Sequence, residues 1–245
     1  MSQQIVILAA GKGTRMGGEI PKVLLPLNIG EPIILHLLNE IKGLPQDTKP
    51  VIVVGFKKEM VMDALGDEYI YVTQFDQKGT GHAVLSAKDQ IVAENFIVLN
   101  GDMPFTTKES LQKLIDSHHQ NRSVVSMVTV KLENFEGGNK YFSSWGRIIR
   151  NAAGEVNKIR EFKDSTDQER LITEVNTGTY MFNSVWIWDK LAQITDDNNQ
   201  HEFYLTDIIE LAIKDGKKVN SLSIDPKEAY GINNPEDLDF ARKLL

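Results

Sequence analysis

IVILAAGKGTRM, residues 5–16, is an apolar run that stops at two alanines and a glycine-rich loop. The four apolar residues at 5–8 predict a buried strand of a parallel sheet. In an open α/β sheet, ligands bind beyond the carboxyl ends of the strands, where Gly11 and Gly13 bracket a lysine. Backbone N–H groups in such a loop can point at an anion, and Arg15 adds positive charge. The segment therefore predicts an α/β fold with an anion site after its first strand.

The loop differs from two well-known phosphate-binding motifs. A dinucleotide fingerprint requires a third glycine where this chain has Met16, and a Walker A loop requires Gly-Lys-Ser/Thr where residues 16–18 read Met-Gly-Gly. A further cation, Lys22, precedes the apolar run 23–27, which is expected to hold it in a fixed direction. Two interpretations remain open at this point: an anion site of unspecified kind, or a tight strand-to-helix turn surrounded by solvated lysines.

The first half of the chain alternates apolar runs with amphipathic segments. This pattern is typical of parallel strands covered by helices on both faces. Strands are expected at 5–8, 51–54, 69–72 and 96–99, and helices at 32–41, 58–65, 80–92 and 108–119.

After about residue 123 the sequence becomes richer in strand patterns, which predicts an extension of the sheet and a lid. Residues 234–237 read as a helix N-cap, a proline at the first helical position and two acidic residues in the first turn, so they predict the start of the last helix. The loop 135–145 is expected to be the only long polar break. Strands are expected at 124–131, 146–150, 156–161 and 178–182, and helices at 185–193, 205–215 and 235–245.

The composition excludes several classes of protein and site. The chain has no cysteine, so disulfides, thiolate zinc sites and a cysteine nucleophile are excluded. Its net charge of -7 argues against a nucleic-acid partner. No apolar run approaches the roughly 20 residues of a membrane helix, and MSQQ at the N-terminus lacks the basic region of a secretory signal. We therefore expect a cytoplasmic protein with neither a nucleic-acid nor a membrane partner.

The opening segment resembles the signature of the sugar-1-phosphate nucleotidyltransferases, Leu-x-x-Gly-x-Gly-x-Arg-Met followed by Pro-Lys, at residues 8–16 and 21–22. The chain is most similar to the uridyltransferase domain of bacterial N-acetylglucosamine-1-phosphate uridyltransferase. Further segments match in order: Gln74, Gly79-Thr80-Gly81-His82-Ala83, Asn100-Gly101-Asp102, Gly146-Arg147-Ile148, Glu161, Asn176-Thr177-Gly178, Tyr204-Leu205-Thr206-Asp207 and Gly231-Ile232-Asn233-Asn234.

This resemblance implies a fold and a reaction. The fold would be α/β and Rossmann-like, of the GT-A type, with a mixed, mostly parallel sheet and helices on both faces. The enzyme would use Mg²⁺ to convert UTP and N-acetylglucosamine-1-phosphate to UDP-N-acetylglucosamine and pyrophosphate, a step of nucleotide-sugar biosynthesis. Residues 1–245 would form a single nucleotidyltransferase domain, with a nucleotide-binding half at 1–122 and a sugar-binding half and lid at 123–245.

The resemblance also implies roles for individual residues. Arg15, Lys22 and Asp102 would be catalytic, and Asp102 and Asn233 would hold the metal. Gly146, Glu161 and Asn176 would hold the sugar phosphate. The implied nucleotide-binding residues are Leu8, Ala9, Ala10, Gly11, Gly13, Lys22, Gln74, Gly79, Thr80 and Gly101.

Elementary chemistry supports the proposed position of Asp102. It follows the apolar strand 96–99, so a rigid element carries a carboxylate to the same sheet edge as the glycine loop. Such an oxygen ligand suits Mg²⁺, which takes one or two protein carboxylates together with phosphate oxygens and water. The alternative is an ordinary turn residue in Asn-Gly-Asp. Asn233 could likewise be a helix cap, although Asn234 can take that role and leave its neighbour free.

Several alternatives to this function stay open. Glucose-1-phosphate or dTTP could replace the expected substrates, since the opening loop is shared across these activities. The stretch 133–145 is longer than the corresponding family loop and borders the expected sugar site. A non-catalytic nucleotide-sugar sensor is a second class. The hexapeptide repeats of an acetyltransferase β-helix domain are not seen, so acetyltransferase activity is not expected. The oligomeric state is left open.

Overall fold

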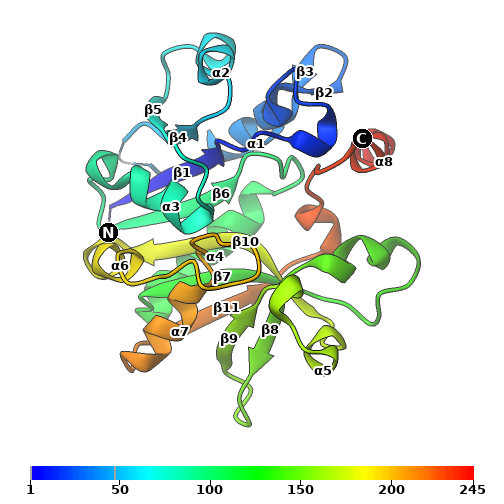
Figure 1. The fold of residues 1–245 in the computed structure, drawn as a ribbon. Coiled ribbons are helices and arrows are strands. Elements are labelled where there is room, and N and C mark those ends of the chain that lie inside the picture. The colour runs from blue at the N-terminus through cyan, green and yellow to red at the C-terminus, as the bar shows by residue number, and fades with distance from the viewer. Residues whose placement is uncertain (1, 47) are drawn as a thin grey trace.

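One mixed sheet of nine strands organises the computed structural model, which describes residues 2–46 and 48–245 (Figure 1). Seven strands follow the order β11-β7-β10-β6-β1-β4-β5, and β8 and β9 extend the sheet from β10. Along the seven-strand path only β10 runs against the others. The strands are β1 (Gln3–Ala9), β4 (Val51–Val54), β5 (Ile70–Thr73), β6 (Asn95–Asn100), β7 (Val125–Lys131), β8 (Arg147–Arg150), β9 (Val156–Arg160), β10 (Glu174–Asn183) and β11 (Val219–Ser223).

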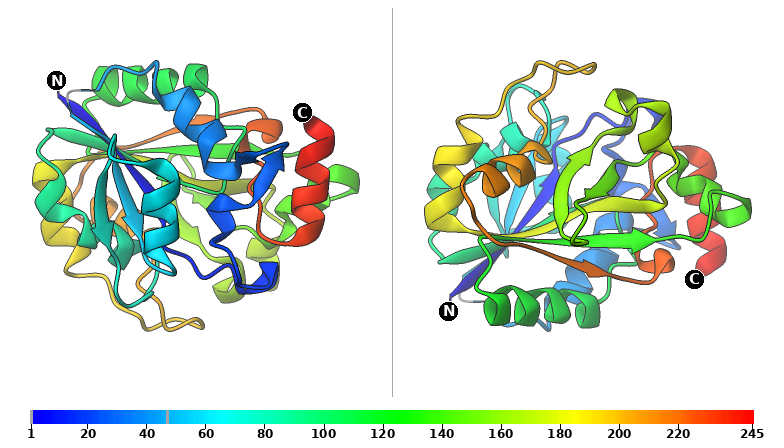
Figure 2. Two further views of the ribbon diagram at one scale, coloured as in Figure 1. Left: turned by 90° about the horizontal axis from the view of Figure 1, so that it is seen from above. Right: turned by 90° about the horizontal axis from the view of Figure 1, so that it is seen from below.

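Helices cover both faces of this sheet (Figure 2). The first group, α1, α2 and α4, packs on one face, and the second group, α3, α6 and α7, packs on the other. A two-stranded hairpin and α8 lie beside each other at one edge. The bounds are α1 (Ile33–Ile41), α2 (Lys58–Leu65), α3 (Thr80–Ser86), α4 (Lys108–Asn121), α5 (Asp167–Arg170), α6 (Ser184–Leu191), α7 (Asp207–Lys214), α8 (Pro235–Leu244), β2 (Pro26–Asn28) and β3 (Glu31–Pro32).

The central strands have continuous apolar runs because both of their faces are buried. In β1, Ile5 and Ile7 pack against the first helix group, while Val6 packs against the second. Alternate side chains of a strand point to opposite faces, so a strand between two helical layers needs an apolar residue at each position. The predicted α/β fold, with a mixed, mostly parallel sheet covered on both faces, is confirmed.

The chain path creates a crevice between β1 and β6. From β1 the chain moves outward to β4 and β5, and then returns to place β6 on the opposite side of β1. Such a reversal is the point where ligands bind in open α/β sheets. The two strand ends are joined directly, because the N–H of Gly101 donates to the carbonyl of Leu8 at 3.0 Å. The glycine loop and the Asp102 turn therefore leave the sheet side by side.

The predicted helix at 80–92 is too long. The α-helix ends at Ser86, and a short 3₁₀ turn at Lys88–Gln90 follows it. The buried Gln4 explains this ending, because its side-chain amide donates to the carbonyl of Gln90 at 3.1 Å and accepts from the N–H of Val92 at 3.1 Å. These bonds to β1 satisfy backbone groups that a longer helix would have used.

Two further differences concern the second half of the chain. β11 (Val219–Ser223) was not expected, since its residues are only partly buried and its sequence, VNSLS, has few apolar residues. The predicted polar break at 135–145 is also wrong. It contains a 3₁₀ helix at Gly137–Ser144, and its Phe142 is fully buried. Within the described residues, no helix is both long and apolar enough to span a bilayer.

Candidate active site

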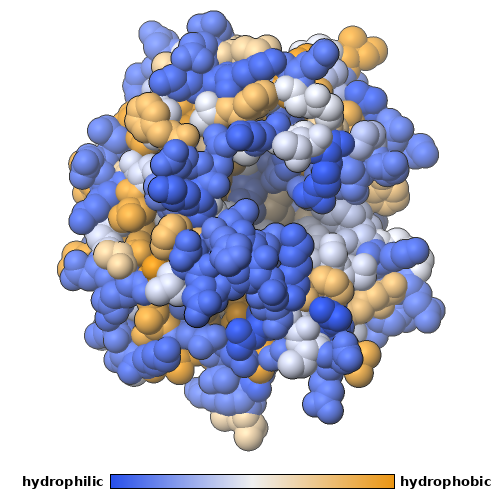
Figure 3. Space-filling view, viewed as in Figure 1, coloured by the Kyte–Doolittle hydropathy of each residue, from blue (hydrophilic) through white to orange (hydrophobic). Residues whose placement is uncertain are grey.

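A cavity of about 290 Å³ lies at the crevice, beyond the carboxyl ends of the parallel strands. The surface is hollowed in this part of the molecule, and mostly hydrophilic residues surround the hollow (Figure 3). The cavity brings together five residues that were predicted from distant parts of the sequence. They are Asp102, Gly146, Glu161, Asn176 and Asn233.

One end of the cavity carries two oxygen atoms that converge on one point. The ammonium group of Lys22 donates to the Asp102 carboxylate, and also to Asn233 Oδ1 at 3.0 Å. The Lys22 and Asp102 side chains are only 16% and 18% exposed, so this pair is largely shielded from water. Because both oxygens already bind the same cationic group, they are placed to bind one metal ion as well. Hard carboxylate and amide oxygens are suitable ligands for Mg²⁺.

Three separate elements deliver these side chains. Lys22 begins the 3₁₀ turn Lys22–Leu24, and Asp102 follows β6. Asn233 immediately precedes the cap of α8, where Asn234 Oδ1 accepts from the N–H of Asp237 at 2.8 Å. The sequence prediction that Asn234 caps the helix is therefore confirmed, and the Asn233 side chain is left free to face the cavity.

The glycine loop packs against the segment that carries Lys22. Gly13 has a φ of 57°, and a Cβ atom there would lie 2.9 Å from Lys22 Cβ. Glycine is thus required both by the backbone conformation and by the close approach. Arg15 and Gly11 lie on the exposed part of the loop. The structure does not bring Arg15 into the hydrogen-bonded group around Lys22.

Three of the predicted nucleotide-binding residues, Gln74, Gly79 and Thr80, also form a connected group. Gln74 is 4% exposed, and its side-chain amide donates to the carbonyl of Gly79 at 3.1 Å and contacts His82 Nδ1 at 3.1 Å. Gly79 has a φ of 105° and lies so close to Phe203 that a Cβ atom would clash with its carbonyl oxygen. The neighbouring Thr80 hydroxyl accepts from the N–H of Leu205 at 3.1 Å.

The turn that follows β4 connects this group of residues to the end of β1. The buried Ala10 accepts a hydrogen bond from the N–H of Phe56 at 3.2 Å. A Cβ atom on Gly55 would touch both Ala10 and the Gln77 side chain. The remaining predicted residues of this end, Leu8 and Ala9, are the last two of β1.

A bulge in β10 shapes the opposite end of the cavity. The register between β10 and β7 shifts between Asn176 and Tyr180. Asn176 N–H donates to the carbonyl of Gly146 at 2.9 Å, and its side-chain oxygen accepts from the Tyr180 hydroxyl at 2.9 Å. Gly178 has a φ of 81° and leaves no room for a Cβ atom beside Asn100. Glycine in the Asn-Thr-Gly motif therefore allows the bulge to reach β6.

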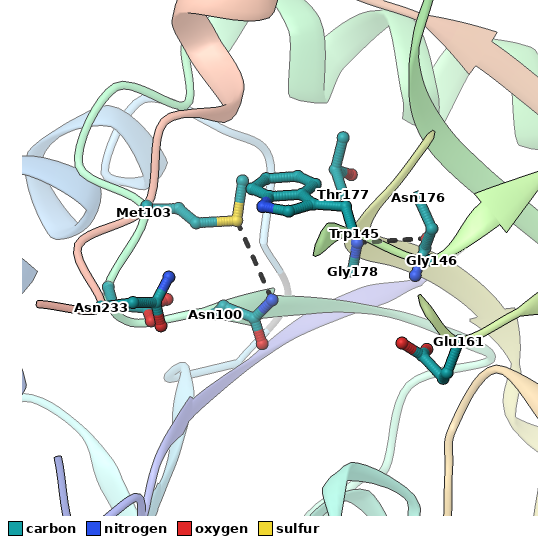
Figure 4. Close-up of a pocket in the computed structure, with 11 residues that line it drawn as sticks. Asn100, Met103, Trp145, Gly146, Glu161, Asn176, Thr177, Gly178 and Asn233 are labelled. Atoms are coloured by element: carbon teal, nitrogen blue, oxygen red, sulfur yellow. Dashed lines mark hydrogen bonds between the residues drawn. The ribbon is translucent and has the colours of Figure 1, made fainter. Parts of the chain in front are cut away.

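Glu161 faces this end, across the cavity from Asn233 (Figure 4). Burial raises the pKa of its carboxyl, and a hydrogen bond from the Thr206 hydroxyl, at 3.2 Å, partly counteracts the shift. The cavity therefore has a cation-binding end at Asp102 and a hydrogen-bonding end at Glu161. This geometry suits a ligand with a phosphate at one end and hydroxyl groups at the other.

Comparison with known proteins places the chain in a family. Residues 5–203 match the model of the MobA-like NTP transferase domain. The chain belongs to this nucleotidyltransferase family. The "Bifunctional protein GlmU" of Streptococcus agalactiae serotype V is 39% identical over all of this chain and 52% of its own length. The protein of the same name from Desulfotalea psychrophila is 40% identical over 98% of this chain and 70% of its length. The chain spans about half the length of the first of these relatives.

Solved structures of low identity share the fold of this nucleotidyltransferase. An apo UDP-glucose pyrophosphorylase aligns over all of this chain and 98% of its own, with a TM-score of 0.78 and 18% identity. HddC from Yersinia pseudotuberculosis covers all of this chain and 99% of its own, with a TM-score of 0.71 and 23% identity. The sequence resemblance to sugar-1-phosphate nucleotidyltransferases is thus confirmed at the level of family and fold.

The structure of this nucleotidyltransferase adds cavity residues that sequence reasoning did not assign. Asn100, Thr177, Gly178 and Gly231 belong to motifs that had been recognised, so the motifs could have indicated them. Trp145 and Met103 each adjoin a motif residue in the sequence. The structure additionally brings their side chains to the same part of the cavity wall (Figure 4). No spacing rule predicts that contact.

Asp207, at the start of α7, gives a stability prediction for this nucleotidyltransferase. Burial and the nearby Glu210 raise the pKa of Asp207 from 3.8 to about 6. The folded state holds this proton more tightly, so its stabilising effect is lost as pH rises from about 4 through 6. Asp207→Asn should match the wild type at pH 4 and be more stable at pH 8, by about 1 kcal/mol after screening by solvent.

Thermal unfolding at both pH values measures this effect. Asp63→Asn, on the exposed side of α2, provides the matched control for the loss of one carboxylate. Equal stability of the Asp207→Asn variant and the wild type at pH 8 would contradict the assignment of a raised pKa to Asp207.

Proposed function

We propose that this chain is a cytoplasmic enzyme that transfers a uridylyl group from UTP to N-acetylglucosamine-1-phosphate. The products would be UDP-N-acetylglucosamine and pyrophosphate. The observation that carries this proposal is the single cavity at the crevice. Lys22, Asp102 and Asn233 meet at its one end, and Glu161 and Asn176 lie at the other. The identity to two GlmU proteins along almost the whole chain supports the choice of substrates.

The proposed reaction needs no covalent enzyme intermediate. A phosphate oxygen of the sugar phosphate attacks the α-phosphorus of UTP. The bond from that phosphorus to the bridging oxygen breaks, and its electron pair leaves with pyrophosphate. The attacking group is already anionic, so no general base is required. The main barrier is the approach of two anions and the charge that develops on the phosphates.

The chain's own residues would lower this barrier by position and charge. Lys22 lies at the cation-binding end and would contact the phosphates. Mg²⁺ held by Asp102 and Asn233 would stabilise negative charge on phosphate oxygens when bound. Arg15, on the exposed glycine loop, would bind the triphosphate when the loop closes over it. At the other end, Glu161 and Asn176 would accept and donate hydrogen bonds to the sugar.

The nucleoside would lie along the end of β1, over residues 8–11 and 13. Gln74 would then recognise the base, because its buried amide is fixed by Gly79 and cannot turn freely. An amide that cannot turn presents its donor and its acceptor in one fixed arrangement, so it discriminates between bases better than a mobile amide does. Thr80 and Gly101 would line the same nucleotide region.

Pyrophosphate release from a panel of substrate pairs tests this function. UTP and dTTP would each be combined with N-acetylglucosamine-1-phosphate and with glucose-1-phosphate. The expected result is the highest kcat/KM for UTP with N-acetylglucosamine-1-phosphate, roughly tenfold or more above the glucose compound, because hydrogen bonds to the acetamido group would be lost. Preference for glucose-1-phosphate or for dTTP would contradict the substrate assignment. Binding of UDP-sugar without turnover of any pair would instead support a sensor.

A further inference from the structure

The segment 135–145 reaches the cation-binding end of the cavity through one side chain. The Tyr141 hydroxyl donates to the carbonyl of Gly231 at 2.5 Å and accepts from the N–H of the same residue at 3.0 Å. Gly231 lines the cavity and stands two residues before Asn233. One hydroxyl thus satisfies both backbone polar groups of a cavity-lining residue, from a segment 90 residues away in sequence.

The backbone that carries Asn233 is also held at the two residues that follow Gly231. Ile232 N–H donates to the carbonyl of Asp102 at 2.9 Å, and Asn233 N–H donates to the Asp237 carboxylate at 2.9 Å. A Cβ atom on Gly231 would lie 3.3 Å from the Met103 side chain, so the two segments are in close contact. Tyr141 supplies the hydrogen bonds at Gly231 itself. Its loss would leave the start of this segment without a partner for either backbone group.

The Tyr141 ring is itself fixed by aromatic neighbours. Its centroid lies 4.6 Å from Tyr230, 4.9 Å from Phe142 and 5.5 Å from Trp145. These contacts hold the hydroxyl against Gly231, where it donates to the carbonyl and accepts from the N–H.

We propose that Tyr141 is a positioning residue, which holds Asn233 beside Asp102 by fixing the backbone at Gly231. The inference rests on the proposed function to the extent that these two oxygens bind the metal. It gives the segment 135–145 a definite task, because the aromatic residues within it hold the Tyr141 ring in place. The residue acts on the metal site through Asn233 and does not touch the substrates.

Tyr141→Phe tests the proposal, because it removes the hydroxyl and keeps the ring. The matched control is Tyr230→Phe. Tyr230 belongs to the same aromatic group and adjoins Gly231, but its hydroxyl donates to the carbonyl of Gly138, at 2.9 Å. Binding of Mn²⁺ alone would be measured from the EPR signal of the free hydrated ion. Tyr141→Phe should raise the Kd about tenfold, and Tyr230→Phe should change it less than twofold.

Asn233→Ala and the double variant Tyr141→Phe/Asn233→Ala show whether the effect passes through Asn233. The double variant should bind Mn²⁺ no more weakly than Asn233→Ala alone, since Tyr141 has nothing left to position. Additive losses, an unchanged Kd for Tyr141→Phe, or an equal loss in Tyr230→Phe would each overturn the proposal. If Asp102→Ala binds Mn²⁺ like the wild type, the metal assignment fails, and the inference falls with it. Thermal unfolding of each variant confirms that it is folded.

Discussion

Asp102→Ala is expected to lower kcat by on the order of 10³ or more at saturating Mg²⁺, while the protein remains folded. The carboxylate is one of the two oxygens that converge at the cation-binding end of the cavity. Without it, this end of the cavity loses the Asp102 negative charge and one of the two proposed metal ligands. The electrostatic stabilisation that a bound metal supplies to the phosphates is worth several kcal/mol, and most of it would be lost.

The fold should tolerate this change, because the structural contact of Asp102 is made by its backbone. Its carbonyl accepts from the N–H of Ile232, and alanine retains that bond. A loss of about 1 kcal/mol from the ion pair with Lys22 would shift Tm by roughly 2–4 °C.

Pyrophosphate release and thermal unfolding, measured on the same preparations, check both parts. Asp63→Ala, on the exposed side of α2, changes the net charge equally and should keep wild-type activity. Activity of Asp102→Ala near that of the wild type at saturating Mg²⁺ would rule out the metal assignment.

Lys22→Ala is expected to lower kcat by on the order of 10² or more. The Lys22 ammonium is held by Asp102 and Asn233, within a largely shielded group, so its charge is already in place before the substrates bind. A preorganised charge in a shielded site stabilises a developing negative charge more than a solvated lysine does. The neighbouring Lys12 is exposed on the glycine loop, and Lys12→Ala should change kcat much less.

The kinetic constants separate two roles for Lys22. A loss in kcat indicates stabilisation of the transition state, whereas a change in KM alone would mean that Lys22 binds the ground state equally well. Mn²⁺ binding provides a second distinction. Removing the ammonium leaves both oxygens free, so Lys22→Ala should not weaken Mn²⁺ binding, while Asp102→Ala should. Weaker binding in the Lys22 variant would show that the lysine orders the oxygen pair.

The sequence predicts the central strands well because burial on both faces leaves little ambiguity. The runs at 5–8, 51–54 and 96–99 are apolar at each position, and each lies within a strand of the structure. At the edge of the sheet this pattern is lost, so the partly exposed β11 was missed. The end of α3 was also misplaced, because it depends on Gln4, a residue that lies far away in the sequence.

The site could be predicted where family motifs carry it and not where tertiary packing does. Asp102, Glu161 and Asn233 were placed by resemblance, and the structure brings them into one cavity. Spacing alone could not have paired Lys22 with Asn233, since 211 residues separate them. The hydrogen bonding of Tyr141 to Gly231 could not be predicted, because the polar residues of 135–145 suggested a loop. Four aromatic residues scattered through that segment pack into one cluster with Tyr230, which comes from a distant part of the chain.

The reversed direction of β10 has a consequence for how this fold can change. Because β10 runs against β6 and β7, its first residues lie at the edge where those strands end. The bulge at 176–178 therefore faces the cavity at the crevice although it comes from a separate stretch of chain. Residues 132–178 connect β7 to the bulge in β10 and include β8, which pairs with β10, and β9, which pairs with β8, but neither pairs with β1, β4 or β5. Gly146, Glu161 and Asn176, the residues proposed to hold the sugar phosphate, all lie on this stretch, so exchanging it would alter the proposed sugar site while β1, β4 and β5 keep their arrangement.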